Sequence, residues 1–211
     1  MTAFDFESLY RFDDQCRDGL TRLCGIDEAG RGPLAGPVFA AAVVLKPETR
    51  FNFLRDSKKI TAKRREALFD QITEQALDYG IGAASVEEID RLNILQATYL
   101  AMERAAAALK QIPERILVDG NRMPPNLPCE AFTQIKGDDT SASIAAAAVL
   151  AKVSRDRYMT RLDEKYPEYG FARHKGYGTA YHYEQIRANG ISPVHRRSFL
   201  KMEIASGVPI L

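Results

Sequence analysis

The chain has 211 residues, of which 45% are hydrophobic and 27% are charged. This composition is typical of a folded globular domain and excludes disordered and collagen-like chains. The longest nearly apolar run, residues 34–45, spans 12 positions, whereas a membrane helix needs about 20. We therefore expect no membrane span.

The compartment can be inferred from the N-terminus and the cysteines. The opening residues MTAFDFESLY carry acids where a signal peptide carries a basic region, so no secretion signal is predicted. The three cysteines are widely spaced, which indicates neither a disulfide framework nor a zinc knuckle. We therefore expect a cytoplasmic protein.

The formal net charge of +1 conceals an uneven distribution along the chain. Residues 140–211 contain 11 Lys or Arg and 6 Asp or Glu, a net +5, whereas residues 1–139 contain 18 and 22, a net −4. All three histidines also lie in the later segment. A basic segment on an otherwise acidic chain is compatible with contacts to phosphate groups, and equally with an ordinary solvated face.

Hydrophobic spacing and turn residues predict helices that alternate with short strands. In chain order, the predicted elements are a helix at 4–18, strands at 21–26 and 38–45, a helix at 61–77, a strand at 79–86, helices at 86–92 and 94–110, strands at 115–118 and 130–135, and helices at 140–162 and 179–188. This order indicates one α/β domain over residues 1–211, built on a mixed sheet.

Acidic residues lie at three predicted junctions where a strand ends. Asp27 and Glu28 follow the first strand, Asp119 follows the fourth, and Asp138 and Asp139 lie between the last strand and the long helix. The carboxyl ends of strands line the functional crevice of α/β sheets, where neighbouring acids repel one another. A divalent cation such as Mg²⁺ offsets this repulsion, and two such ions can promote phosphodiester cleavage. For each acid alone, the alternative is a turn former or a helix cap.

The glycine-rich turn at 30–36 differs from two well-known phosphate loops. Counted from Gly30, Gly32 fits a dinucleotide fingerprint, but Ala35 stands where the third glycine is required. The chain contains no Gly-Lys pair, so the turn is not a Walker A loop. Its glycines can still bring the backbone close to a sugar or a phosphate, and the alternative is a plain tight turn.

Residues 174–178, His-Lys-Gly-Tyr-Gly, combine basic and aromatic side chains with a flexible backbone. Lys175 can neutralise a phosphate, and Tyr177 can stack on a base or a sugar. The alternative is an exposed loop with an incidental tyrosine. His174 and His182 lack the H-E-x-x-H spacing, so neither is predicted to bind zinc.

Seven segments carry recognisable motifs. They are GIDEAGRGPLAGPV at 25–38, DSKKIT at 56–61, VDGN at 118–121, KGD at 136–138, SIAAAAVLAKVSRDR at 143–157, HKGY at 174–177 and HRRSF at 195–199. In this order they resemble bacterial ribonuclease HII, the type 2 ribonuclease H. The resemblance extends over residues 22–200 and so covers nearly the whole chain.

The resemblance implies a ribonuclease H-like fold, with a mixed five-stranded sheet flanked by helices and a helical C-terminal portion over residues 160–211. It implies an endonuclease that hydrolyses RNA in RNA–DNA hybrids and cuts on the 5′ side of single ribonucleotides in duplex DNA, leaving a 3′-hydroxyl and a 5′-phosphate. The cofactor would be Mg²⁺ or Mn²⁺, with two ions in the catalytic state. We expect a monomer whose partners are these nucleic acids, and a sliding-clamp contact is left open.

The same resemblance assigns the site residues. The catalytic and metal-binding acids would be Asp27, Glu28, Asp119 and Asp138. The substrate-binding residues would be Gly30, Arg31, Gly32, Ser57, Lys58, Lys175 and Tyr177. The glycine turn would read the 2′-hydroxyl largely through its backbone, and Tyr177 would sense the ribose-to-deoxyribose junction by stacking on the following sugar.

Two of these assignments have alternatives. Asp139 directly follows Asp138, and Asp156 is a second rival for the fourth acid, although an ion pair with a flanking arginine is the simpler interpretation of Asp156. Ser57 lacks the G-x-S-x-G context of a nucleophile, so from the residues alone it is a helix cap.

Three other classes of protein were weighed against this hypothesis. A different metal-dependent nuclease or a resolvase on the same fold is disfavoured by the glycine turn and the HKGY segment. A catalytically silent nucleic-acid-binding module would be expected to lack one or more of the four acids, and all four are present. A structural interaction protein would show a heptad pattern or a repeat, and the sequence shows neither.

Overall fold

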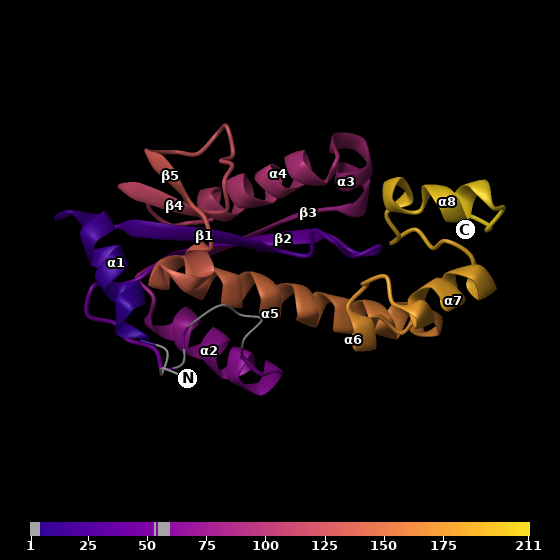
Figure 1. Cartoon of the computed structure of the whole chain (residues 1–211), viewed down its shortest axis with the longest axis horizontal. Coiled ribbons are helices and arrows are strands. Elements are labelled where there is room, and N and C mark those ends of the chain that lie inside the picture. The colour runs from indigo at the N-terminus through magenta and orange to yellow at the C-terminus, as the bar shows by residue number, and fades with distance from the viewer. Residues whose placement is uncertain (1–4, 53, 55–59) are drawn as a thin grey trace.

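The computed structural model describes residues 5–52, 54 and 60–211 of the chain. It contains a five-stranded sheet between two layers of helices, and the C-terminal helices lie beyond one end of the sheet (Figure 1). Ser57 and Lys58, two of the expected substrate-binding residues, lie outside the described residues. Within the described ranges, no helix combines the length and the apolar character needed to cross a membrane.

The sheet mixes antiparallel and parallel pairing. Its strands are β1 (Leu23–Ala29), β2 (Val38–Val44), β3 (Asp78–Ala84), β4 (Arg115–Asp119) and β5 (Ala131–Gln134). Their order across the sheet is β3-β2-β1-β4-β5. Strand β2 is antiparallel to both β1 and β3, whereas β4 is parallel to both β1 and β5. The mixed five-stranded sheet expected from the sequence is confirmed.

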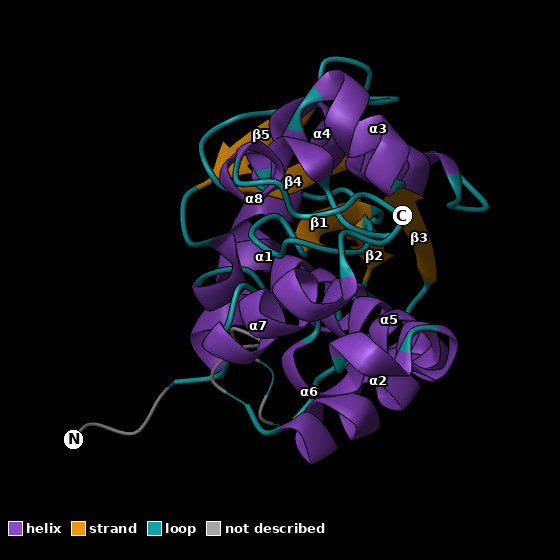
Figure 2. Cartoon of the chain, turned by 90° about the vertical axis from the view of Figure 1, so that its right-hand side faces the viewer, coloured by secondary structure: helices purple, strands orange, loops and turns teal. Residues whose placement is uncertain are grey.

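Helices cover both faces of this sheet. They are α1 (Glu7–Arg17), α2 (Ala62–Gln75), α3 (Val86–Leu92), α4 (Ile94–Ala107), α5 (Ala142–Lys165), α6 (Phe171–His174), α7 (Ala180–Asn189) and α8 (Lys201–Ala205). Helices α3 and α4 lie on one face, and α2 and α5 lie on the other (Figures 1 and 2). Side-chain caps start several of them, such as Thr61 at α2 and Ser85 at α3, where Glu88 completes a capping box.

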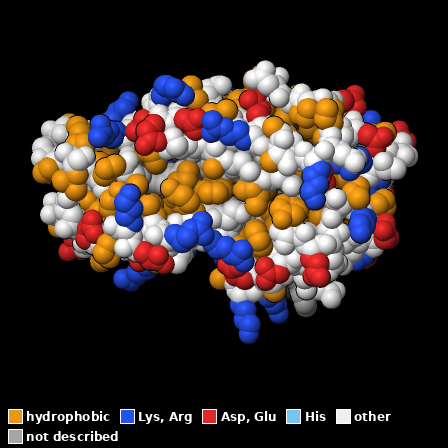
Figure 3. Space-filling model, turned by 180° about the vertical axis from the view of Figure 1, so that it is seen from behind, with side chains coloured by type: hydrophobic (Ala, Val, Ile, Leu, Met, Phe, Trp, Pro, Cys, Tyr) orange, Lys and Arg blue, Asp and Glu red, His pale blue; other side chains and the backbone are white. Residues whose placement is uncertain are grey.

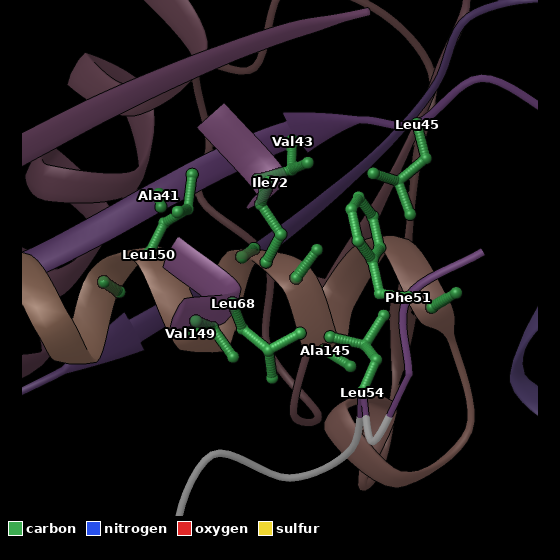
Figure 4. Close-up of a cluster of buried hydrophobic side chains, with 14 of the residues drawn as sticks. Ala41, Val43, Leu45, Phe51, Leu54, Leu68, Ile72, Ala145, Val149 and Leu150 are labelled. Atoms are coloured by element: carbon green, nitrogen blue, oxygen red, sulfur yellow. The ribbon is translucent and has the colours of Figure 1, made fainter. Parts of the chain in front are cut away.

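Strand β2 and helix α5 form the centre of the core. Successive residues of β2 point to opposite faces, and both faces are buried, as expected of a strand with a continuous apolar sequence. On the α5 side, apolar residues of β2, α2 and α5 pack together (Figure 4): Ala41, Val43, Leu68, Ile72, Ala145 and Val149. The small residues of α5 allow this helix to lie close against the sheet.

The start of α5 is fixed at two points. A Cβ atom on Gly25 would lie 2.2 Å from the backbone carbonyl carbon of Ser143, so β1 and α5 meet backbone to backbone. The buried Asp13 carboxylate of α1 accepts hydrogen bonds from the Ser141 hydroxyl at 2.6 Å and from the Ser143 amide at 2.8 Å. These contacts also hold in place the 3₁₀ turn Gly137–Asp139 that precedes α5.

The helices and strands predicted from the sequence are confirmed, although some of their ends differ. The shortest helical segments were not predicted. The strand predicted at 21–26 continues to Ala29, so Asp27 and Glu28 lie within β1 rather than after it. The prediction of its end was wrong because β2 pairs with both acids and extends the ladder through them. The sequence patterns missed α6, α8 and the 3₁₀ turn at Gly137–Asp139, because a single helical turn is too short to show a period.

Candidate active site

Neighbouring strands bring the predicted acids together at one edge of the sheet. In the parallel pair of β1 and β4, Ile26 is opposite Val118, and each is followed directly by an acid, Asp27 and Asp119. Strand β5 is parallel to β4, and Asp138 lies in the 3₁₀ turn that follows β5. The carboxyl ends of three parallel strands therefore converge here, as expected from the sequence.

The acids interact electrostatically. Burial raises the pKa of Asp27 well above its ordinary range, and the negative charges of Glu28, Asp119 and, more weakly, Asp138 raise it further. The backbone N–H of Glu28 donates to Asp27 Oδ1 at 2.7 Å and partly offsets this effect. The structure thus brings the other three predicted acids within electrostatic reach of Asp27.

Hydrogen bonds hold two further carboxylates of this group, those of Asp119 and Glu28. The Gly137 amide donates to Asp119 Oδ1 at 2.7 Å and ties the turn that bears Asp138 to the end of β4. A Cβ atom on Gly137 would lie 2.5 Å from Ile144 Cδ1, so a side chain at this position would displace the Ile144 methyl group. Arg31 Nη1 donates to Glu28 Oε1 at 3.3 Å, which links the glycine turn to the acids.

The donor set suits a hard divalent cation. Among the described residues, no three Asp, Glu, His or Cys side chains already converge closely enough to form a complete metal cage. Mg²⁺ does not require one, since it binds through one or two carboxylates together with water and substrate phosphate. All four candidate ligands are carboxylates. Burial first, and then the charges of the neighbouring acids, raise the pKa of Asp27, and a bound cation would offset both effects. The residues therefore fit Mg²⁺ or Mn²⁺.

The glycine turn and Tyr177 are neighbours although they are far apart in the sequence. The Leu34 amide donates to the Gly176 carbonyl at 2.8 Å, which ties the turn to the loop that carries Tyr177. A Cβ atom on Gly32 would lie 3.8 Å from Tyr177 Cε1. The Tyr177 side chain is 44% exposed, so its ring is available to a ligand beside the turn.

Lys175 lies at a groove whose lining carries charges of both signs, including the acids Glu66 and Asp156. The space-filling view shows the surface hollowed at its lower edge, with Lys and Arg side chains gathered beside the hollow (Figure 3). Helices α2 and α5 and the segment after α6 form a groove of about 400 Å³, whose lining includes Arg157, Arg161 and Lys175. Lys175 Nζ donates to Thr160 Oγ1 at 2.7 Å, which holds the ammonium group at this groove.

The prediction that Asp156 pairs with a flanking arginine is wrong. Asp156 Oδ1 accepts from Lys152 Nζ at 2.7 Å, one helical turn away on α5. The adjacent arginines have other partners: Arg155 binds backbone carbonyls, and Arg157 binds Glu66 on α2. Helix geometry explains the outcome, since side chains at i and i+4 are neighbours and adjacent residues diverge.

A chain of hydrogen bonds supports the loop of Tyr177. The Tyr177 carbonyl can only accept, so His182 Nδ1 donates to it at 2.9 Å, and His182 Nε2 is then an acceptor. His195 Nε2 donates to His182 Nε2 at 3.1 Å, and His195 Nδ1 accepts from the Ser192 hydroxyl at 2.7 Å. Every ring nitrogen of His182 and His195 therefore has a hydrogen-bond partner within the protein.

This arrangement predicts that both histidines stay neutral in mildly acidic solution. Burial lowers the pKa of His182 to about 4 and that of His195 to about 3. Between these values and about 6.5 the unfolded chain binds more protons than the folded one, so acidification destabilises the fold by about 1.4 kcal/mol per pH unit for each histidine. Nuclear magnetic resonance titration of the three histidine rings tests this directly. A midpoint near 6.5 for His182 or His195 would contradict it.

The comparison with known protein families shows to which family this chain belongs. Residues 24–202 match the family model of ribonuclease HII. The chain belongs to the ribonuclease HII family. Ribonuclease HII of Marinomonas sp. (strain MWYL1) is 60% identical over 177 residues, covering 84% of this chain and 89% of that protein. Ribonuclease HII of Dechloromonas aromatica (strain RCB) is 60% identical over 178 residues, covering 84% and 90%.

Solved structures of ribonucleases H share the fold. Ribonuclease H2 from Pyrococcus horikoshii OT3 has a TM-score of 0.70 and 28% identity, covering 84% of this chain and 93% of that one. A chain of the PCNA:RNase HII complex from Archaeoglobus fulgidus has a TM-score of 0.59 and 29% identity, covering 88% and 90%. Bst-RNase HIII in complex with Mn²⁺, at 18% identity and a TM-score of 0.66, supports the fold alone. The ribonuclease H-like fold is confirmed.

Family membership establishes the broad activity. As a ribonuclease HII, the chain is a metal-dependent endoribonuclease that acts on RNA–DNA hybrids. One wall of the candidate site carries no signal that the sequence patterns reveal. A pocket of about 250 Å³ beside Glu28 and Asp119 is also lined by Thr98 and Tyr99 of α4 and by Asn121. The alanine-rich pattern of α4 contains no signal for this role, whereas Asn121 belongs to the VDGN motif.

Proposed function

We propose that this ribonuclease HII, besides acting on RNA–DNA hybrids, cuts duplex DNA on the 5′ side of a single embedded ribonucleotide, leaving a 3′-hydroxyl and a 5′-phosphate. The observation that carries the proposal is that the glycine turn is hydrogen-bonded on one side to the loop of the half-exposed Tyr177, through Leu34 N–H and Gly176 O, and on the other side to the acid Glu28, through Arg31. The backbone of the turn can contact the 2′-hydroxyl of one ribose, and the adjacent aromatic ring can stack on the sugar that follows. Recognition would then need only one ribonucleotide.

The acids have distinct roles in this proposal. Asp27, Asp119 and Asp138 would hold the metal ions, while Glu28, which accepts from Arg31, shapes the site and links it to the glycine turn. Two Mg²⁺ or Mn²⁺ ions, when bound, would supply a water of lowered pKa and stabilise the departing 3′ oxygen. Carboxylates bind cations in their ionised form, and the attraction of Asp27 to the ions would offset the burial and the neighbouring negative charges that raise its pKa.

In this proposal the enzyme recognises the ribose 2′-hydroxyl, and the 2′-hydroxyl is not the nucleophile. It is the group that distinguishes RNA from DNA. A site whose buried polar groups pair with a substrate hydroxyl rejects the analogue that lacks it by a large factor, because those groups are otherwise left unpaired. Gly30, Arg31 and Gly32 would make this contact, and Lys175, with Ser57 and Lys58, would contact the phosphate backbone.

The test is a cleavage assay on end-labelled duplex DNA that contains one ribonucleotide, run with Mg²⁺, with Mn²⁺ and with EDTA, beside an all-DNA duplex. A single metal-dependent cut on the 5′ side of the ribonucleotide supports the proposal. Cleavage of a continuous RNA–DNA hybrid without any cut at the single ribonucleotide would refute recognition of the ribose-to-deoxyribose junction. It would still agree with the four acids as the catalytic site.

Tyr177→Ala should reduce cleavage at a single ribonucleotide more than cleavage of a continuous hybrid. Stacking on an aromatic ring contributes about 1–3 kcal/mol per base or sugar contact, so a loss of roughly ten- to a hundredfold is expected on the first substrate. The ratio of kcat/KM values on the two substrates measures the effect. Tyr79→Ala, which removes a similarly exposed tyrosine on β3, is the matched control. Equal losses on both substrates would count against the role of Tyr177.

A further inference from the structure

A buried arginine lies beneath the glycine turn. The Arg196 side chain is fully buried, and its guanidinium donates to three carbonyls of the turn. Nε donates to Gly36 O at 2.9 Å, Nη1 to Arg31 O at 2.9 Å and Nη2 to Gly30 O at 2.6 Å. The planar fork of a guanidinium can reach several acceptors in a fixed geometry, which an ammonium group cannot do.

A second buried arginine supports the same turn from α5. Arg155 Nε donates to Pro37 O and its Nη2 to Ala35 O, each at 3.2 Å. A Cβ atom on Gly30 would lie only 2.0 Å from Arg155 Nε, so the arginine occupies the space that a side chain at Gly30 would need. Four carbonyls of the turn and that of Pro37, the residue after it, therefore point toward two cations in the interior.

Burying two charges is costly unless they are paired or hydrogen-bonded. Within the described part of the chain, neither Arg155 nor Arg196 has a carboxylate ion-pair partner, and backbone carbonyls are what they bind. Burial, followed by the charge of Arg155, lowers the pKa of Arg196 to about 9, so Arg196 is still protonated at neutral pH. The two side chains thus fix the backbone of the glycine turn rather than neutralise acidic side chains.

The direction of these carbonyls determines where the amides point. In a trans peptide, the C=O of one residue and the N–H of the next point in opposite directions. The carbonyls of Gly30 and Arg31 point inward to Arg196, so the N–H groups of Arg31 and Gly32 point away from it. Neither N–H donates to an acceptor among the described residues. The next residue, Pro33, has no N–H, so the outward donors are these two.

We propose that Arg196, assisted by Arg155, is a positioning residue for substrate selection: it holds the glycine turn so that the N–H groups of Arg31 and Gly32 form a fixed pair of donors to the ribose 2′-hydroxyl. This inference rests on the proposed function. A hydroxyl oxygen has two lone pairs and can accept from both amides. Arg196 itself does not touch the substrate, because its side chain is fully buried behind the turn.

The experiment measures binding preference in an Asp119→Asn background, which prevents cleavage. Fluorescence anisotropy in Mg²⁺ compares a duplex bearing one ribonucleotide with an all-DNA duplex of the same sequence. Arg196→Lys keeps a buried positive charge but loses the fork, and we expect it to reduce the preference for the ribonucleotide about 10- to 100-fold. Its affinity for all-DNA duplex should stay within about twofold. Arg197→Lys, the exposed neighbour, is the matched control and should retain the preference.

The outcomes distinguish failure of the proposed function from failure of the positioning role of Arg196. If the Asp119→Asn protein itself shows no preference for the ribonucleotide, the proposed function fails. If it shows one and folded Arg196→Lys keeps it, the role of Arg196 is overturned. A second measurement needs no variant of Arg196: the amide resonances of Arg31 and Gly32 in ¹⁵N-labelled Asp119→Asn protein should shift with the ribonucleotide duplex and not with all-DNA duplex. Unshifted resonances would overturn the donor pair even if Arg196→Lys failed to fold.

Discussion

Asp119→Asn should abolish cleavage while leaving the binding of an RNA–DNA hybrid largely intact. Asp119 is the last residue of β4, beside Asp27, and its charge contributes to the raised pKa of Asp27. The amide of asparagine has nearly the same shape, and its oxygen can still accept the hydrogen bond that Gly137 donates to Asp119 Oδ1. The fold should therefore persist, whereas a negatively charged ligand for divalent cations is lost.

The expected loss in kcat is at least about a thousandfold, since a metal-bound site contributes several kcal/mol to the transition state. Initial rates on a hybrid with saturating Mg²⁺ measure it, and anisotropy on the same hybrid measures binding. Asp70→Asn removes an exposed carboxylate of α2 and should behave like the parent protein. Turnover within a fewfold of the parent would rule out Asp119 as a member of the active site.

Gly32→Ala should fold normally and yet lose most of its activity. The structure leaves room for the methyl group: the nearest atom to a Cβ on Gly32 is Tyr177 Cε1 at 3.8 Å, an ordinary van der Waals contact. Gly32 is also not among the residues with positive φ, so alanine can adopt its backbone conformation. Packing within the protein therefore does not explain the glycine. We expect the reason to be close approach of a substrate to the backbone.

We expect the free energy of unfolding of Gly32→Ala to lie within about 1 kcal/mol of the parent value. Cleavage at a single ribonucleotide should fall about a hundredfold, because a shift of the substrate by about 1 Å has effects of that size. Urea unfolding and kcat/KM provide the two measurements. Full activity in the stable variant would show that the substrate does not approach the turn closely.

Gly30→Ala provides the contrast within the same turn. Gly30 has φ of +97°, and its Cβ would lie 2.0 Å from Arg155 Nε, so alanine is both strained and obstructed there. This variant should lose stability as well as activity. The pair of variants thus distinguishes a glycine required by the fold from a glycine required by the ligand.

Several parts of the site could be predicted because their signals are local. Strand-length apolar runs predicted β2 and β4, and the acids at 27–28 and 119 were recognised because they adjoin such runs. The ordered motifs indicated the family without any coordinates. The end of β1 was misplaced because the sequence does not reveal that β2 pairs alongside Asp27 and Glu28.

The reasons that the remaining features escaped prediction are also physical. Arg155 and Arg196 lie in motifs that the sequence analysis quoted, yet nothing local distinguishes a buried arginine from an exposed one such as Arg197. Their acceptors are 118 and 166 residues away in the Arg155–Pro37 and Arg196–Gly30 contacts. No pattern of periodicity or turn chemistry extends over such separations.

The sequence by itself determined the order of the elements, the acids and the family, because propensity, spacing and motif composition depend on neighbouring residues. Tertiary structure alone decided which acids interact electrostatically with Asp27, which glycine is free of packing constraints and which arginines hold the glycine turn. The physical reason is that burial, desolvation and hydrogen-bond direction are properties of the packed chain. They arise only when β1, α5 and the C-terminal segment meet around the glycine turn.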